Sequence, residues 1–254
     1  MASITLVSLN VERKKNSERV VAFLGERAPD VACLQEACDT DISLFMKAFG
    51  ARESHYVPMT VQYELTGEMN EHGLCILSRF PMSNKSTRYY FGDSAHLPVS
   101  NERIPETFAS GQNRMLALCD VETPDATYRV GTTHFTWTPK GEVDDVQRKD
   151  IAVLLTFLRS EKEFILCGDF NAPRGGEIFS ELAKRYKDNI PPGYKTSLDL
   201  ELHRAAKDRR HEIENKMVDG LFTTPGYVAS DVKLVDGVSD HCAIVANLER
   251  DTTA

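Results

Sequence analysis

Nine short apolar runs recur along the chain, and each is bounded by Gly, Pro, Asn or Asp. Runs of this length and composition are typical of β-strands. Because a sheet must bury at least one face, so many strands favour two packed sheets with helices outside them. The predicted strands are 4–9, 31–35, 74–78, 115–121, 128–135, 164–168, 217–223, 227–235 and 242–248.

Helical periodicity lies between some of these runs. Residues 17–27 carry apolar side chains at helical spacing behind a candidate cap at Asn16 or Ser17. Residues 143–160 repeat the pattern over a longer stretch, and 177–186 form a shorter third candidate. Together the strands and helices predict an α/β fold, a two-sheet β-sandwich flanked by helices.

Two polar, Pro-containing stretches, 84–112 and 187–215, are predicted to be long surface loops. Loops of this length in a compact domain are often functional. The sequence has no low-complexity linker and no repeat at a fixed period. We therefore expect a single catalytic domain over residues 1–254.

The charge balance bears on the kind of partner. The chain has 38 Asp and Glu against 30 Lys and Arg, a net charge of −8. A broad basic surface for duplex binding is therefore not expected. A nucleic-acid substrate is still compatible with this charge, because a local patch or bound divalent cations can supply positive charge.

The cysteines and the apolar runs indicate a compartment. Most of the six cysteines lie inside apolar runs and none forms a C-x-x-C pair, which favours buried reduced thiols over zinc or disulfides. The first residues lack a signal-peptide pattern, and no run of 18 apolar residues occurs. We expect a cytoplasmic monomer without stable membrane insertion.

Polar side chains stand at the ends of six apolar runs, where the strands of packed sheets can meet at one edge. Taken singly, each has an ordinary explanation as a turn residue, a helix cap, a solvated acid or a buried histidine. Their occurrence in one chain favours a shared site. These residues are Asn10, Glu36, His134, Asp169 with Asn171, Asp219, and Asp240 with His241.

Longer motifs around these residues follow one another over nearly the whole chain. They are "LVSLNVE", "DVACLQE", "HGLCILSRFPM", "NRMLAL", "GTTHF", "FILCGDFNAP", "MVDGLFTTP" and "GVSDHCAIVA". In these motifs and their order the chain resembles the endonuclease/exonuclease/phosphatase superfamily, which includes DNase I-like nucleases, deadenylases, neutral sphingomyelinases and tyrosyl-DNA phosphodiesterase 2-like enzymes. The resemblance implies a DNase I-like four-layer α/β/β/α sandwich with the site at one edge of the sheets.

The resemblance also implies a metal site. Glu36, Asn10 and Asp240 match the metal positions of the superfamily, and their oxygen atoms suit Mg²⁺, a hard cation that prefers oxygen ligands. We expect Mg²⁺ as the cofactor, with Mn²⁺ as a substitute. Such an ion lowers the barrier to phosphoester hydrolysis by offsetting charge on the phosphoryl oxygens.

The remaining roles follow from the same resemblance. Asp169 is the expected general base or water-orienting carboxylate, and Asn171 would hold the scissile phosphate or that water. We expect Gly168 to let the chain turn and both side chains to point the same way in extended backbone. His241 would contact or protonate the phosphate, with Asp219 hydrogen-bonded to its other ring nitrogen.

His134 separates two groups within the superfamily. Exonuclease-III-like members typically have Tyr here, whereas DNase I-like, sphingomyelinase-like and tyrosyl-DNA phosphodiesterase 2-like members have His. His134 and Arg114 are candidate catalytic or substrate-binding residues, with a surface charge as the other interpretation of Arg114. Glu71 is either the partner of His134 or a solvated loop acid.

The sequence thus predicts a Mg²⁺-dependent phosphodiesterase acting on nucleic acid or nucleic-acid ends. Motif spacing resembles the tyrosyl-DNA phosphodiesterase 2-like branch, although "GDFN" stands where that branch has "GDTN". A phosphoesterase for lipid or inositol headgroups is the alternative within the class. A catalytically silent binding protein on the same fold is the alternative outside it, which the complete set of polar residues disfavours.

Overall fold

Two mixed sheets form the centre of the protein in the computed structural model, which describes residues 3–104, 106–107 and 111–251. The first sheet has seven strands in the order β12-β13-β1-β2-β4-β3-β6, with β1 parallel to β2 and antiparallel to β13. Its strands are β1 (Ser3–Asn10), β2 (Val31–Cys38), β3 (Glu53–Tyr63), β4 (Met69–Ser78), β6 (Val99–Asn101), β12 (Tyr227–Val235) and β13 (Ala243–Arg250).

The second sheet has six strands in the order β10-β11-β9-β8-β7-β5. β8 and β9 are parallel, whereas β9 and β11 are antiparallel, as are β7 and β8 in the predicted hairpin. Its strands are β5 (Met82–Phe91), β7 (Arg114–Glu122), β8 (Thr127–His134), β9 (Ile165–Asp169), β10 (Lys187–Asp188) and β11 (Asp219–Thr223).

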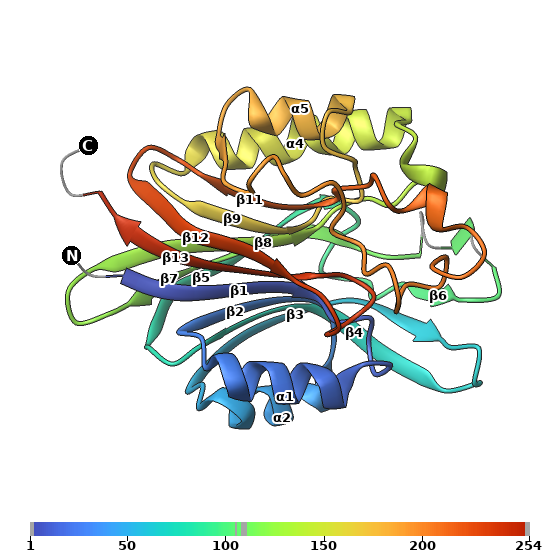
Figure 1. Ribbon diagram of the computed structural model, residues 1–254, viewed down its shortest axis with the longest axis horizontal. Coiled ribbons are helices and arrows are strands. Elements are labelled where there is room, and N and C mark those ends of the chain that lie inside the picture. The colour runs from blue at the N-terminus through green and yellow to red at the C-terminus, as the bar shows by residue number, and fades with distance from the viewer. Residues whose placement is uncertain (1–2, 105, 108–110, 252–254) are drawn as a thin grey trace.

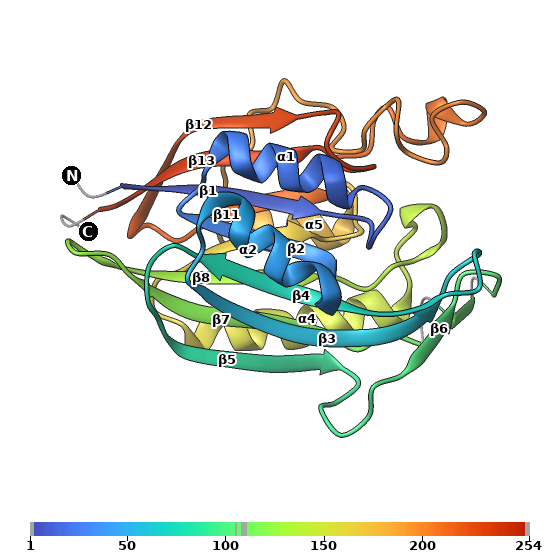
Figure 2. The ribbon, with the colours of Figure 1, turned by 90° about the horizontal axis from the view of Figure 1, so that it is seen from below.

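Helices cover the outer faces of both sheets. Figure 1 shows α4 (Asp145–Ser160) and α5 (Glu177–Ala183) outside the second sheet, and α1 (Ser17–Arg27) and α2 (Ile42–Phe49) outside the first. Seen from below, α1 and α2 lie over the strands of the first sheet (Figure 2). The predicted four-layer α/β/β/α sandwich is therefore confirmed. Short 3₁₀ turns lie at Asp39–Asp41, Pro139–Gly141 and Arg210–Glu212.

The main core lies between the sheets and takes side chains from both. Leu6 and Ile76 of the first sheet and Ala117, Val130 and Cys167 of the second belong to it. Separate clusters lie beneath the two helical layers. All six cysteines are buried and free, as the sequence predicts.

β1 shows why many of the runs are apolar at nearly every position. Ile4 and Leu6 pack between the sheets, whereas Val7 and Leu9 pack on the other face beneath the helices. A strand covered on both faces buries both sets of its side chains. Such runs are visible in a sequence, and all nine predicted strands are present.

The elements that sequence analysis missed have weaker patterns. The predicted loop 84–112 is wrong in its first part, because residues up to Phe91 belong to β5. β5 is an edge strand with mostly half-buried polar residues, so its apolar signal is low. β3 contains Pro58 and α2 has only eight residues, and neither was predicted. The stretch 187–215 is largely irregular, as expected.

The predicted helices are confirmed with small shifts at their ends. α1 spans the predicted residues, α4 begins after a cap in which Asp144 accepts a hydrogen bond from the Gln147 amide, and α5 ends at Ala183. The expected side-chain cap of α1 is absent, because Asn16 makes no cap hydrogen bond and its Nδ2 donates to Glu12 instead.

Gly168 has a different role from the one predicted. It lies within β9, paired with Gly220 of β11 and facing Thr133 of β8, rather than in a turn. Its φ is 144°, and a Cβ there would lie 2.0 Å from the Thr133 carbonyl oxygen. Glycine therefore lets β8 and β9 approach closely beside Asp169.

We expect Gly168→Ala to lower the free energy of unfolding by about 2–4 kcal/mol, because the methyl group meets backbone and the φ value is strained. Urea titration measures the effect. Gly193→Ala is the matched control, since a Cβ at that position meets nothing within 4 Å. Equal unfolding midpoints for the two variants would contradict this account.

Candidate active site at one edge of the two sheets

A cavity of about 340 Å³ opens at the edge where β1, β2, β8 and β9 end. Because β1 is parallel to β2 and β8 is parallel to β9, each pair brings its carboxyl ends to one edge. All but one of the predicted site residues line the cavity, and Asp219 lies behind them in contact with His241. The lining residues among them are Asn10, Glu36, Arg114, His134, Asp169, Asn171, Asp240 and His241.

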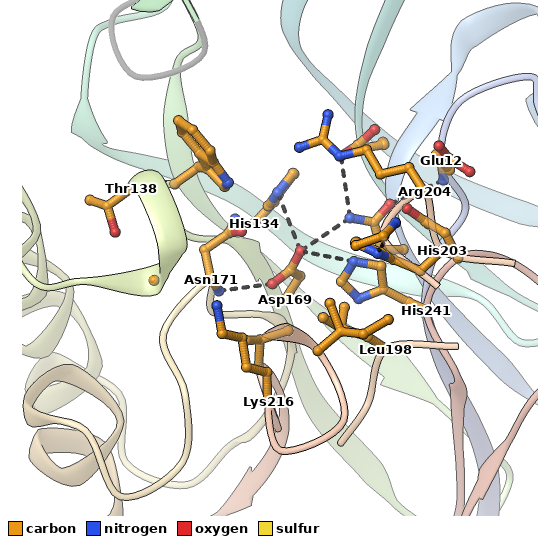
Figure 3. A pocket seen from close by; sticks show the side chains of 18 of the residues that line it. Glu12, His134, Thr138, Asp169, Asn171, Leu198, His203, Arg204, Lys216 and His241 are labelled. Atoms are coloured by element: carbon orange, nitrogen blue, oxygen red, sulfur yellow. Dashed lines mark hydrogen bonds and ion pairs between the residues drawn. The ribbon is translucent and has the colours of Figure 1, made fainter. Parts of the chain in front are cut away.

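Asp169 lies at the centre of this site (Figure 3). Its Oδ2 accepts a hydrogen bond from Asn10 Nδ2 at 3.1 Å, so the two sheets meet here through side chains. His134 Nε2 lies 3.5 Å and His241 Nε2 lies 3.8 Å from the same oxygen. Burial and the nearby Asp219 raise the pKa of the Asp169 carboxyl, while the two histidines oppose the change.

The predicted pairing of His241 with Asp219 is present. His241 Nδ1 and Asp219 Oδ2 are 2.8 Å apart, and Asp219 is the strand partner of Asp169. Burial lowers the pKa of His241, but Asp219 and Asp169 outweigh it and the pKa lies well above the ordinary value. With Nδ1 held by Asp219, the ring presents Nε2 to Asp169 at 3.8 Å.

His134 differs from His241 although both reach the same carboxylate. Burial lowers its pKa to about 4, with Arg114 acting in the same direction. Its Nδ1 has no hydrogen-bond partner among the described residues. Glu71 therefore makes no hydrogen bond to it, and the Glu71 carboxylate accepts one from Tyr56 at 3.2 Å. The pKa values of the two imidazoles that approach Asp169 are thus shifted in opposite directions.

Asn171 is part of a turn and also lines the site. Its φ is 48°, so the backbone is left-handed rather than extended as expected. Asp169 Oδ1 accepts a hydrogen bond from the Asn171 amide at 2.8 Å, an Asx-turn. Asn171 Nδ2 donates to the Phe135 carbonyl at 2.9 Å, and the residue lines the cavity.

Glu36 lies where the regular pairing of β2 with β4 is interrupted. The register shifts between Leu34 and Ala37, and Glu36 has a φ of 55°. Its Oε1 accepts from Asn10 Nδ2 at 3.3 Å and its Oε2 from Arg13 Nη1 at 2.7 Å. Burial alone would raise the pKa of Glu36, but the Arg13 guanidinium holds it well below the ordinary value.

Arg13 is a site residue that sequence analysis missed. Its guanidinium also lies 2.8 Å from Glu64 Oε1 and 3.3 Å from Glu102 Oε1, and its side chain is only 10% exposed. In the sequence it stands in "NVERKK", which is indistinguishable from a solvated run of charges. Its partners lie far along the chain, so only the fold reveals the cluster.

The acidic side of the cavity fits a hard cation. Asn10 Oδ1, Glu36 and Asp240 offer oxygen atoms around one cavity. Burial raises the pKa of Asp240 to about 7, and the negative charges of Glu12 and Glu36 contribute. A divalent cation would offset this concentration of carboxylates.

A second donor set lies deeper in the site. Ligand atoms of Asp169, Asp219 and His241 all lie within 4.8 Å of one another, so this buried group is a possible metal site. These three residues differ from the predicted metal ligands, which are Asn10, Glu36 and Asp240.

Arg114 is buried, so its interpretation as a surface charge is wrong. Its Nη1 donates to the His134 carbonyl at 3.3 Å, and burial lowers its pKa. The guanidinium therefore lies behind His134 while lining the cavity.

Comparisons with solved structures show the same architecture. An endonuclease/exonuclease/phosphatase from Beutenbergia cavernae DSM 12333 has a TM-score of 0.74 at 16% identity, covering 98% of this chain and 72% of that one. The human Nocturnin catalytic domain has a TM-score of 0.70 at 17% identity, with 98% and 94% covered. A mannosyl-6-phosphatase of Bacteroides thetaiotaomicron VPI-5482 has a TM-score of 0.65 at 12% identity, with 97% and 99% covered.

At these identities the structural matches show the fold alone. A search of curated proteins gives no match. A family model matches residues 7–241, which include every predicted site residue. Fold and site together define a phosphoesterase. The chain belongs to the endonuclease/exonuclease/phosphatase family.

We expect Arg13→Met to destabilise the fold by about 3 kcal/mol or more, because it leaves buried carboxylates without their cation. Chemical unfolding at neutral pH measures the loss. Arg148→Met is the control, since Arg148 pairs with Glu177 on the surface and its removal should change stability little. An equal effect of both substitutions would show that the Arg13 cluster adds no stability.

Proposed function

We propose that the protein is a Mg²⁺-dependent phosphodiesterase acting on nucleic acid or its ends. One observation carries the proposal: a buried carboxylate, Asp169, is met at a cavity by two imidazoles and one amide. Their nitrogens lie 3.1 Å to 3.8 Å from one carboxylate oxygen. Such a group can accept a proton from water while donors stabilise a phosphoryl group beside it.

The chain's own residues divide the chemistry between them. Asp169 accepts or orients the proton of the attacking water, held in place by Asn10 and by the Asx-turn of Asn171. His241, fixed by Asp219, donates a hydrogen bond to the phosphate. Arg114 lies behind His134 and supports the position of that ring.

We place Mg²⁺ on Asn10, Glu36 and Asp240. When bound, it supplies Lewis-acid stabilisation of charge on phosphoryl oxygens. The all-oxygen set supports this choice. In the deeper set, the Nδ1 of His241 already forms a 2.8 Å hydrogen bond to Asp219, which favours an orienting pair there over metal ligands.

The proposal also names a substrate class, nucleic acid or its ends. The family match supports phosphoester chemistry, and a cavity of about 340 Å³ is of the size that small ligands occupy. No helix among the described residues is long and apolar enough to cross a membrane. The comparisons do not single out the tyrosyl-DNA phosphodiesterase 2-like branch, so that assignment stays a prediction.

A substrate panel tests the proposal. Single- and double-stranded DNA, RNA, 5′-tyrosyl oligonucleotides, sphingomyelin and inositol phosphates are incubated with the protein and Mg²⁺ or Mn²⁺. Cleavage of nucleic acid supports the proposal. Sphingomyelin or inositol phosphate cleavage without nuclease activity would replace it with the headgroup alternative, and no hydrolysis of any substrate would favour a silent scaffold.

EDTA should abolish hydrolysis and added Mg²⁺ should restore it, because the acidic side of the cavity needs a cation. Glu36→Gln should raise the Mg²⁺ concentration for half-maximal activity roughly tenfold or more, as one charged ligand is lost. Glu26→Gln, an exposed change on α1, is the control. Full activity in EDTA would exclude this mechanism.

Asp169→Asn should lower kcat roughly 10²–10⁴-fold, the range for a lost general base. The amide keeps an oxygen that can accept from the Asn171 backbone, so the turn is retained. Asn171→Ala should lower kcat roughly 10²–10³-fold if its side chain holds the phosphate or water, but it also puts Ala at a φ of 48°.

Kinetics and thermal melts on the same samples separate the two effects. A site role predicts low kcat in folded Asp169→Asn protein. A role confined to the turn predicts normal kcat in both variants and lost stability in Asn171→Ala.

A further inference from the structure

Groups of both charges line the cavity. Glu12, Glu36 and Asp240 belong to the proposed metal site and its surroundings. Four other lining residues, which we together call the basic side, are Lys140, His203, Arg204 and Lys216. Asp169 and His241 also line this cavity, and Figure 3 shows His203, Arg204 and Lys216 in the same close-up around them. The proposed chemistry does not use the basic side.

The segment 197–216, which carries His203, Arg204 and Lys216, is hydrogen-bonded to residues 240–242 just before β13. Leu198 forms a β-bridge with His241, the Asp199 amide donates to the Asp240 carbonyl at 2.9 Å, and the Cys242 amide donates to the Ser197 carbonyl at 2.7 Å. The segment is long and irregular, yet these bonds fix its start beside the reacting groups.

The same segment has a small core of its own. Leu198, Ala205, Ala206, Ile213 and Val218 pack together, and all of them except Ala206 also line the cavity. The Thr196 hydroxyl lies within hydrogen-bond distance of the carbonyls of Ile213 and Lys216, which links the two ends of the segment. An ordered loop of this kind holds cations in place before a ligand arrives, which lowers the entropy lost on binding.

The cations of the basic side lack anionic partners among the residues that the structure describes. Arg204 and the Lys140 ammonium make no hydrogen bond or ion pair there, and Lys216 Nζ donates only to the neutral Lys140 carbonyl at 2.8 Å. Asp199 forms no ion pair with any described residue, and its carboxylate accepts hydrogen bonds from three backbone amides instead.

Neighbouring arginines outside the basic side behave differently. Arg209 pairs with Glu212 and Arg210 pairs with Glu201, both at 3.1 Å. Arg13, on the acidic side, is enclosed by carboxylates. In a chain of net charge −8, Lys140, Arg204 and Lys216 thus line the cavity without an ion pair to any described residue. Their mutual repulsion is relieved when an anion binds.

His203 adds a neutral donor. Its Nδ1 accepts a hydrogen bond from the Ala205 amide at 3.1 Å, which leaves the ring proton on Nε2. Burial and nearby cations lower the pKa of His203 to about 4, in agreement with this neutral form. The oxygens of an anion can accept hydrogen bonds from this imidazole and from the cations Lys140, Arg204 and Lys216.

We propose that the basic side binds a second phosphate of the substrate, distinct from the phosphoester attacked at Asp169. The inference rests on the proposed function for the identity of the first phosphate. A cavity of about 340 Å³ accommodates more than one phosphoryl group. The second phosphate belongs either to a neighbouring nucleotide of a strand or to a small bisphosphorylated molecule.

Matched substrates separate this subsite from the reaction centre. Thymidylyl-thymidine has one phosphodiester, and its 5′-phosphorylated form adds one phosphate; inositol monophosphate and bisphosphate form the second pair. Arg204→Gln combined with Lys216→Gln should lower kcat/KM at least tenfold for the substrate with two phosphates and less than threefold for its partner. The pair that shows this difference identifies the source of the second phosphate.

Lys207→Gln is the control, because Lys207 is exposed on the same segment and does not line the cavity. It should change neither rate. Equal losses for both members of each pair would overturn the proposal, since the cations would then serve the scissile phosphate. No loss for either member would overturn it as well.

Binding without turnover gives an independent readout. Trp137 is the single tryptophan of the chain and lines the same cavity. Pyrophosphate, titrated into the metal-free protein in EDTA, should change its fluorescence, and the double variant should bind at least tenfold more weakly. This holds even if no phosphodiesterase activity is found. Wild-type affinity in a folded double variant, or no binding to the wild type, would overturn the proposal.

Discussion

The site depends on the pairing of three strands around β9. Asp169 is in register with His134 of β8 on one side and with Asp219 of β11 on the other. Backbone hydrogen bonds therefore set the spacing of the acid–imidazole pairs before any side chain is placed. The close approach at Gly168 is part of this arrangement, because a side chain there would push β8 away and move His134 from Asp169.

The second sheet alone does not complete the site. Asn10, at the end of β1, donates to Asp169 across the interface between the sheets and to Glu36 of the neighbouring strand β2 in its own sheet. Its amide is thus a direct polar link between the proposed base and the proposed metal ligands. The packing of one sheet on the other sets the distance between these groups, so the core between the sheets contributes to the chemistry although it contains no reacting atom.

Electrostatics explains why a chain of net negative charge can keep this edge folded. Arg13 lies within ion-pair distance of Glu36, Glu64 and Glu102, and its guanidinium offsets part of the negative charge on the acidic side. Asp240 is left with a raised pKa. The basic side, in contrast, has positive charges without anionic partners among the described residues. A phosphoester bound between a cation on one side and these unpaired basic groups on the other would relieve both.

Sequence patterns predicted the parts whose causes are local. Strands covered on both faces appear as apolar runs, and the polar residues at their ends mark the site edge. Arg13 could not be predicted, because its partners lie on other elements, and neither could Arg204, whose position depends on a bridge between Leu198 and His241. Edge strand β5 was missed because half-buried polar residues carry little periodic signal.

The stretch "GDFN" shows how a turn and a site can be one structure. The Asn171 amide binds Asp169 Oδ1, which closes the Asx-turn and fixes the carboxylate plane. The other oxygen, Oδ2, is then presented to Asn10, His134 and His241. Turn-forming residues in "GDFN" are therefore compatible with a catalytic role, because the turn orients the Asp169 carboxylate.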